Sequence, residues 1–271
     1  MSKKIIEIEK VDYPYTCAIV NNQVMGFLDE VEEVRSLELL PVTYGEGRRT
    51  YERSIAFLAA VALKKISPKS RLTIVHSVGD ALYGEIENTT ESAIEDLKTE
   101  FANLVKENKL ITKYELTKEV AIRRLEKEGR FEDIQTIEFL SEETVSLYEL
   151  DGIYLYFAGP LVPYTGMVKV YDIQRVNDGL FFLLPDKKDP SKPITLPRYQ
   201  KFHEAISEGK KWASLLEVRT VGELNRSIIN GKISNIIKIQ EALHEKKISE
   251  IAQTIKDKKA KVVLISGPSS S

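Results

Sequence analysis

Three tight-turn signals, each flanked by runs of β-branched and aromatic residues, constrain the fold of this chain most strongly. They are Asn21-Asn22, Asp151-Gly152 and Asp178-Gly179. Such pairs tolerate the positive φ angles that two-residue hairpins require. The sequence therefore predicts three antiparallel hairpins, the last of them between strands at residues 168–173 and 180–184.

Amphipathic helices separate these hairpins. Apolar residues recur at three- and four-residue spacing from Tyr51 to Ile66, where Pro68 follows, and again from residue 90 to 108 and from 117 to 128. Thr90 and Thr117 are the expected N-caps, and Gly129 is the expected stop of the third helix. Strands and helices in this order predict an α+β fold.

The two ends of the chain follow different patterns. Residues 1–47 predict short strands, including Ile5–Ile8 and Val24–Leu28, and Gly45-Glu46-Gly47 is expected to break that pattern. Residues 185–197 hold four prolines and predict a loop. Residues 198–258 predict two or three helices, with breaks near residues 220–222 and 230–231.

Composition excludes several classes of protein. The formal net charge of −2 gives no bulk argument for binding nucleic acid or membranes, although a local basic patch remains compatible with it. The single cysteine, Cys17, excludes a disulfide framework and favours a reducing compartment. No apolar stretch reaches the length of a membrane span, and the N-terminus lacks the apolar core of a signal peptide. We therefore expect a cytoplasmic protein with no membrane contact.

The last eleven residues form an incomplete phosphate-binding pattern. An apolar run, Val262–Ile265, leads to Gly267 and then to Pro268, Ser269, Ser270 and Ser271. The phosphate loop of P-loop NTPases is G-x-x-x-x-G-K-[ST] after a buried strand, and this chain ends before the Gly-Lys-Ser/Thr. The alternative is an ordinary Gly/Ser/Pro linker. Without the lysine that reaches the phosphates, we expect no ATP binding by this chain.

The middle of the chain resembles the editing domain of threonyl- and alanyl-tRNA synthetases. Residues 157–166, Phe-Ala-Gly-Pro-Leu-Val-Pro-Tyr-Thr-Gly, match a stretch of the threonyl enzyme that resembles C-R-G-P-H-V-P-H-T-G. The helix motif of that family, in a context like R-H-S-A-A-H-L-L-A, falls on residues 53–59. The order of the following hairpin and helices is also similar.

The metal ligands of that family are not retained. The two histidines of its H-x-x-x-H motif fall on Arg53 and Phe57. The cysteine and histidine of its C-x-x-x-H motif fall on Phe157 and Leu161. A guanidinium and three hydrocarbon side chains offer no lone pair to zinc. We therefore expect no metal site and no zinc-dependent deacylase, and we expect the apolar side chains to pack together instead.

The whole chain is similar to the N-terminal region of bacterial uridine kinase-like proteins, which join a synthetase-like region to a kinase that opens V-V-L-I-S-G-P-S-S-S-G-K-T-T. Residues 51–54 and 74–77 also resemble that family. The resemblance implies four parts: a partial β-grasp (TGS-like) domain at 1–47, an editing-like (SAD-like) domain at 48–218, a helical linker at 219–260 and the start of a P-loop kinase domain at 261–271.

The resemblance implies a function for the full-length protein, which is phosphoryl transfer from ATP to a nucleoside with Mg²⁺. This chain would be its non-catalytic, inactive region, with no cofactor of its own. The alternative is a module for binding tRNA or other RNA, or for dimerisation to a homo-oligomer, derived from an editing domain without deacylase activity. A metal-free hydrolase ranks last, because no activated nucleophile stands out.

Five residues are candidates to line a retained cleft: Arg49, Arg53, His76, Tyr164 and Lys169. The arginines, with Arg48, either grip phosphate at a helix start or form a solvated face paired with Glu46 and Glu52, which is the commoner case. His76 either contacts a ligand or is structural. Tyr164, Thr165, Lys169 and Asp172 either line the cleft or only shape a connection. His203 and His244 receive no role.

Overall fold

The structure of the protein is a computed structural model, and it describes residues 2–88, 91–176 and 179–265. The chain divides into two compact units, Met1–Phe202 and His203–Ser271. We call them the body and the helical unit, and each is described by itself. The four-part division expected from the sequence stays a prediction.

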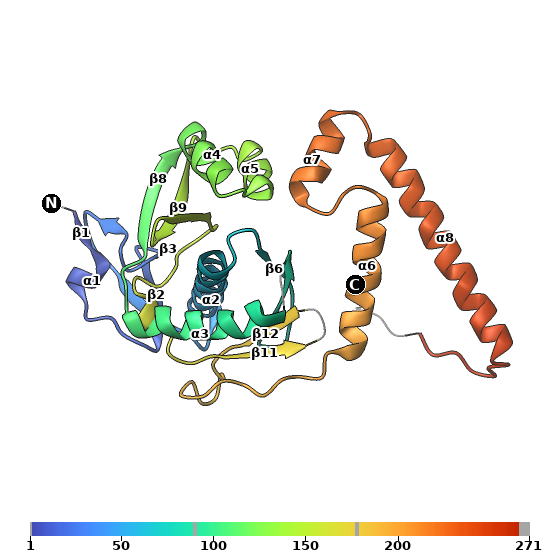
Figure 1. Ribbon diagram of the computed structural model, residues 1–271, viewed down its shortest axis with the longest axis horizontal. Coiled ribbons are helices and arrows are strands. Elements are labelled where there is room, and N and C mark those ends of the chain that lie inside the picture. The colour runs from blue at the N-terminus through green and yellow to red at the C-terminus, as the bar shows by residue number, and fades with distance from the viewer. Residues whose placement is uncertain (1, 89–90, 177–178, 266–271) are drawn as a thin grey trace. The chain divides into compact units, whose positions relative to one another are not determined.

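The body begins with two small antiparallel sheets (Figure 1). One has the strand order β3-β2-β5 and the other pairs β1 with β4. Asn21 and Asn22 have φ angles of 50° and 67°, so the first predicted hairpin is confirmed. The bounds are β1 Lys3–Lys4, β2 Tyr15–Val20, β3 Gln23–Met25, β4 Glu30–Val31 and β5 Leu37–Pro41.

Two strand predictions in this region are wrong. Ile5–Ile8 forms a one-turn helix, α1, that buries Ile5 in the core. The Glu7 carboxylate accepts a hydrogen bond from the Lys4 N–H at 3.3 Å, which favours the turn over an extended strand. The return strand ends at Met25, because the Gly26 N–H donates to the Asp29 carboxylate at 2.7 Å and starts a turn.

Helix α2, Gly45–Ile66, is the centre of the body (Figure 1). It begins at Gly45, six residues before the predicted periodicity starts at Tyr51, since Gly45-Glu46-Gly47 forms its first turn and is not a break. A Cβ at Gly47 would lie 2.2 Å from the carbonyl oxygen of Pro41, so only glycine permits this contact with β5. Nearly all of the apolar face of α2 is buried, and its fully buried side chains include Tyr51, Phe57 and Leu58.

A four-stranded antiparallel sheet packs beside α2 in the order β11-β12-β7-β6. Its strands are β6 Arg71–Val78, β7 Ala81–Glu87, β11 Asp172–Val176 and β12 Gly179–Leu183. The hairpin between β11 and β12 is confirmed, although Asn177 and Asp178 of its turn lie outside the described residues. Strand β11 begins four residues later than expected. Val170 bonds through both its N–H and its C=O to the Tyr51 hydroxyl, at 3.0 and 2.9 Å, which removes both groups from strand pairing.

Helix α3, Glu91–Glu107, also packs on α2. Its predicted apolar face is confirmed, with Ile94, Leu97, Phe101 and Leu104 buried. The expected N-cap, Thr90, lies outside the described residues.

A small lobe of the body has its own apolar cluster, which includes Leu125, Ile137 and Leu147. The sheet order is β10-β9-β8, and the β9–β10 turn at Asp151-Gly152 confirms a predicted hairpin. Gly129 has a φ of 69° after α4, as expected of a helix stop. Strand β8 and helix α5 were not predicted. The bounds are β8 Thr112–Thr117, α4 Lys118–Lys127, α5 Phe131–Glu138, β9 Thr144–Leu150 and β10 Ile153–Tyr156.

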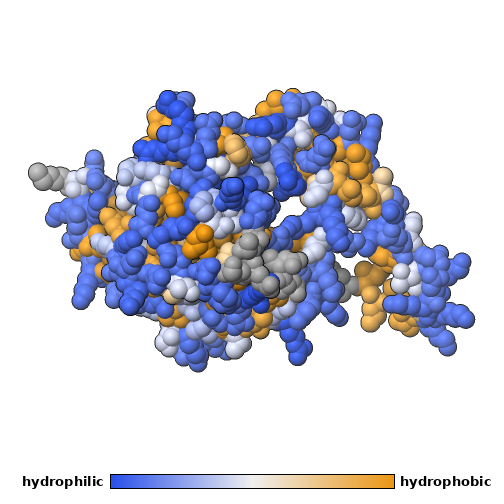
Figure 2. Space-filling view, in the orientation of Figure 1, coloured by the Kyte–Doolittle hydropathy of each residue, from blue (hydrophilic) through white to orange (hydrophobic). Residues whose placement is uncertain are grey.

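The helical unit contains helices α7 Val221–Ile229 and α8 Ile233–Asp257, after α6, Gln200–Leu215, which begins in the body. The predicted breaks are confirmed: Thr220 caps α7, accepting from the Glu223 N–H at 3.1 Å, and Gly231 has a φ of 68°. Among the described residues of these helices only Gly222 is buried. Figure 2 shows hydrophobic residues at the surface around α7, where Val221 and Ile229 are exposed.

The strand expected before the phosphate loop is not formed. Val262–Ile265 has no strand pairing, and Leu264 and Ile265 are 92% and 95% exposed. A buried strand needs neighbouring strands, and the described residues of this unit are helices and irregular segments. No helix among the described residues is both long and apolar enough to span a membrane.

A network of ion pairs joins α2, α3 and the β9–β10 turn. Asp151 accepts from Lys109 at 2.9 Å and from Lys65 at 3.2 Å, and Lys65 also contacts Glu100 at 2.5 Å. Partial burial raises the pKa of Asp151, but hydrogen bonds from the two lysines outweigh burial and hold that pKa below its usual value. The network therefore stabilises the body only while Asp151 is ionised.

We expect Asp151→Asn to lower the free energy of unfolding by about 1 kcal/mol at pH 7. A carboxyl whose pKa is lower in the folded state gives stability above its unfolded pKa and loses it as the pH falls through the folded one. Urea titrations at pH 7 and pH 3 should show a smaller deficit at the lower pH. Asp96→Asn, at an exposed site on α3, is the matched control, and an equal loss there would contradict the role of the network.

Candidate functional site

The positions that the resemblance predicts to match the metal ligands of the editing enzymes lie together where α2 meets the loop after β10. The rings of Phe57 and Phe157 pack edge to face with their centroids 5.9 Å apart, and Leu161 is buried in the same core. The predicted packing of these apolar side chains is confirmed. Their hydrocarbon surfaces cannot hold a metal ion, so the residues present do not fit the metal of the editing enzymes.

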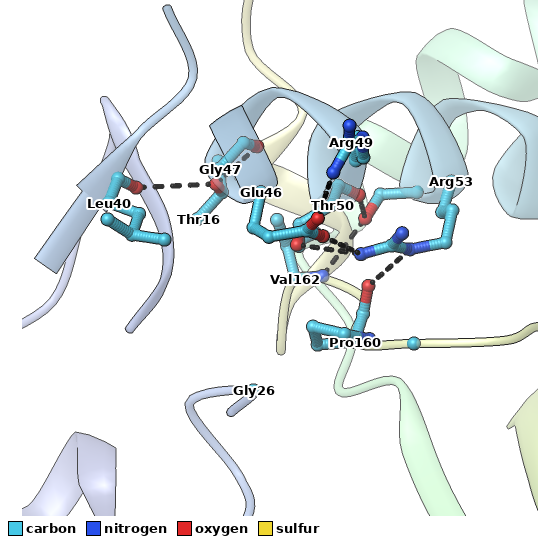
Figure 3. A network of polar contacts seen from close by, with 12 residues as sticks. Thr16, Gly26, Leu40, Glu46, Gly47, Arg49, Thr50, Arg53, Pro160 and Val162 are labelled. Atoms are coloured by element: carbon cyan, nitrogen blue, oxygen red, sulfur yellow. Dashed lines mark hydrogen bonds and ion pairs between the residues drawn. The ribbon is translucent and has the colours of Figure 1, made fainter. Parts of the chain in front are cut away.

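Arg53 fills the fourth of these positions and binds the loop directly (Figure 3). Its Nε donates to the carbonyl oxygen of Pro160 at 3.1 Å, and its Nη2 donates to the Thr50 hydroxyl at 3.1 Å. The same nitrogen lies 3.6 Å from a carboxylate oxygen of Glu46. The guanidinium lies so close to Gly159 that a Cβ there would be 2.9 Å from the Arg53 Cζ. Gly159 also has a φ of 112°, a backbone conformation that favours glycine.

Ser54 fixes the next part of the loop. Its hydroxyl accepts from the Val162 N–H at 2.9 Å and donates to the Thr50 carbonyl at 2.7 Å, and Ser54 is fully buried. The Tyr148 hydroxyl donates to the Gly159 carbonyl at 2.9 Å, and burial raises the pKa of Tyr148 to about 12. We call residues 157–162 the docked loop, because three side chains bond its backbone to the body.

Carboxylates pair with the arginine cluster, as one of the two alternatives expected, but the cluster does not form the solvated face of that alternative. Arg49 pairs with Glu46, which also contacts Arg53, and all three lie on one face of α2 (Figure 3). Arg48 is buried, where it donates to the Pro185 carbonyl at 2.6 Å and lies 3.3 Å from the Asp80 carboxylate. Only Arg49 extends into solvent, with 65% of its side chain exposed.

His76 lies elsewhere, on the sheet that holds β6 and β7. Its ring stacks on Tyr83 at a centroid distance of 5.0 Å and meets the edge of Phe202 at 5.4 Å. These aromatic contacts belong to the sheet, and no described contact joins His76 to the docked loop. The structure thus does not bring His76 together with Arg49 and Arg53.

Tyr164 and Lys169 share a separate surface cleft of about 390 Å³, with Asp12 and Asn108. The Lys169 ammonium lies 2.9 Å from Asp12, and this hydrogen bond lowers the pKa of the Asp12 carboxyl. The positive charge of Lys169 is therefore paired within this cleft.

Thr165 and Asp172 serve local structure. Thr165 is buried and donates to the Leu104 carbonyl at 2.5 Å, and Asp172 accepts from its neighbour Ile173 at 2.9 Å. The phosphate-loop candidates, Gly267 to Ser271, lie outside the described residues.

Two larger clefts were not predicted. One of about 490 Å³ lies between the end of α2 and the turn before α5, and one of about 580 Å³ contains Asp29 and Lys113. Burial acts to lower the pKa of Lys113, but the Asp29 carboxylate at 2.9 Å outweighs it and raises that pKa. These contacts span distant segments, so no spacing in the sequence indicates them. The i, i+3 and i+7 spacing of Glu46, Arg49 and Arg53 puts them on one helix face, but the break expected at residues 45–47 hid this signal.

The chain is similar to threonyl-tRNA ligases. It is 29% identical to that of Clostridium tetani over 163 residues, 25% identical to that of Carboxydothermus hydrogenoformans over 164, and 28% identical to that of Clostridium novyi over 163. Each match covers 59% of this chain and 26% of the ligase, so the chain matches about a quarter of these relatives. No protein-family model matches the chain. The similarity supports the synthetase part of the predicted relationship, whereas the kinase part stays a prediction.

We expect Ser54→Ala to destabilise the protein by about 1–3 kcal/mol, because it leaves the buried Val162 N–H without an acceptor. Urea unfolding measures the loss, and hydrogen exchange should show faster exchange at the Val162 amide. Thr99→Ala is the matched control, since its hydroxyl makes only an exposed bond to a carbonyl of its own helix. Equal stability of the Ser54 and Thr99 variants would contradict the docked loop.

Proposed function

We propose that this chain is a non-hydrolytic RNA-binding module with the architecture of a tRNA-synthetase editing region. The similarity to threonyl-tRNA ligases supports RNA as the partner, and tRNA is the first candidate. The observation that carries the proposal is the docked loop, because Arg53, Phe57 and Phe157 occupy the positions where the editing enzymes hold their metal.

Hydrolysis of an aminoacyl ester needs an activated water or a nucleophile beside its base. Arg53 is a permanent cation already bound to Pro160 and Glu46, and Phe57 and Phe157 are apolar. The only hydroxyl joined to this loop from α2 among the described contacts, that of Ser54, is fully buried and uses both its donor and its acceptor. These residues therefore supply neither group, and we propose binding without turnover.

The kinase function, with ATP, Mg²⁺ and a nucleoside as partners of a longer protein, stays a prediction from the sequence. The described residues add nothing to it, since Val262–Ile265 is exposed and forms no strand. Dimerisation likewise stays an alternative, and localisation in the cytoplasm stays an expectation.

Fluorescence anisotropy with labelled tRNA tests the proposal. We expect saturable binding that weakens from 50 to 200 mM KCl, because phosphate contacts release counterions. In parallel, threonine-specific tRNA charged with serine is incubated with the protein or in buffer alone. We expect the serine to be released no faster with the protein than in buffer. Absence of binding at 50 mM KCl would contradict the RNA function, and accelerated deacylation would contradict its non-hydrolytic character.

A further inference from the structure

Charge is divided unevenly between the two units of the chain. Residues 203–271 carry twelve Lys and Arg against eight Asp and Glu, a formal charge of +4, and residues 1–202 carry 27 against 33, a charge of −6. The net charge of −2 therefore conceals a basic helical unit and an acidic body. An RNA partner of an acidic body would meet repulsion, whereas the helical unit would attract it.

Cations in the clefts of the body are largely neutralised. In the 490 Å³ cleft, Lys64 lies 3.5 Å from Glu128, Arg130 lies 2.6 Å from Asp133, and Arg71 pairs with Glu132. Two further lysines of this cleft, Lys69 and Lys127, are balanced by Glu87 and Glu126 on its walls. The cations of this cleft are therefore balanced by acidic residues, so the cleft offers no excess of positive charge to an RNA partner.

The end of α8 has the opposite character. Lys256, Lys258, Lys259 and Lys261 are exposed, and none has an ion-pair partner in the part of the chain that the structure describes. The one acidic residue between them, Asp257, accepts a hydrogen bond from the Gln253 amide at 2.7 Å. The lysines are thus free to contact an anionic partner.

The local backbone fixes where these lysines are presented. The Ala260 N–H bonds to the Ile255 carbonyl at 3.2 Å and the Lys259 N–H to the Lys256 carbonyl at 3.0 Å, with Lys259 at a φ of 48°. This pattern closes the helix with a left-handed residue. Lys256 therefore lies in the last turn, while Lys259 and Lys261 follow on the departing chain.

We propose that these four lysines, which we call the lysine cluster, form the main phosphate-contacting surface of the chain for RNA. The inference rests on the proposed RNA function and assigns it to residues of the helical unit. Lysines near a helix C-terminus also stabilise the helix by a few tenths of a kcal/mol through its dipole. That role needs only one or two cations in the last turn, whereas three of these four lie beyond Asp257, the last residue of the helix.

The test compares two variants of the full chain that lose the same charge. The first replaces the lysine cluster: K256Q, K258Q, K259Q and K261Q. The control replaces four exposed lysines of the body, K10Q, K69Q, K127Q and K188Q, and so also tests the 490 Å³ cleft. Glutamine keeps a helix propensity close to that of lysine, and far-UV circular dichroism checks the helix content.

We expect the cluster variant to bind tRNA at least about tenfold more weakly at 50 mM KCl, with a log–log salt slope smaller in magnitude by about 3, while the control changes little. An equal or larger loss in the control would overturn the inference and leave the RNA function standing. No tRNA binding by the wild type would overturn both. In that case, vesicles containing phosphatidylserine that bind the wild type but not the cluster variant would assign the lysines to a membrane surface.

Discussion

The first three turns of α2 hold the body together by bonding to backbone groups of distant segments. The Thr16 hydroxyl donates to the Gly47 carbonyl at 2.6 Å. The Tyr51 hydroxyl bonds to both the N–H and the C=O of Val170. Arg53 and Ser54 bond to the backbone of the docked loop. Backbone groups in loops have no regular partner, so each of these bonds removes the cost of burying an unsatisfied polar group. Burial raises the pKa of Tyr51 far above its usual value, which keeps this hydroxyl neutral and able to donate.

This arrangement shows how α2 and the loop after β10 are joined by side chains that cannot bind a metal. A metal would join the helix to the loop through side-chain ligands, and here the same two segments are joined by a guanidinium, a serine hydroxyl and a pair of aromatic rings. These contacts fix the docked loop on α2. The net positive charge of this chain lies in the helical unit, whereas the body is net negative.

Local signals in the sequence predicted much of the fold. Turn residues with positive φ located the hairpins, and periodicity located α2, α3 and α4. The errors occurred where a tertiary contact decides the backbone. Ile5–Ile8 is helical although its residues favour strands, and Gly47 looks like a helix breaker until the Pro41 carbonyl beside it is known. Val262–Ile265 has the composition of a buried strand but no strand beside it among the described residues.

The candidate site was only partly predictable for the same reason. The packing of Phe57 against Phe157 followed from matching residue positions to a known motif, whereas the separation of His76 from Arg53 depends on how the sheet lies against α2.

The most direct test of the account is the zinc content of the purified chain, together with its thermal unfolding with and without a chelator. Less than one zinc in ten chains and an unchanged unfolding midpoint are the results that we predict, because a metal bound only to the native state would stabilise it measurably. One zinc per chain and a midpoint lowered by the chelator would contradict it.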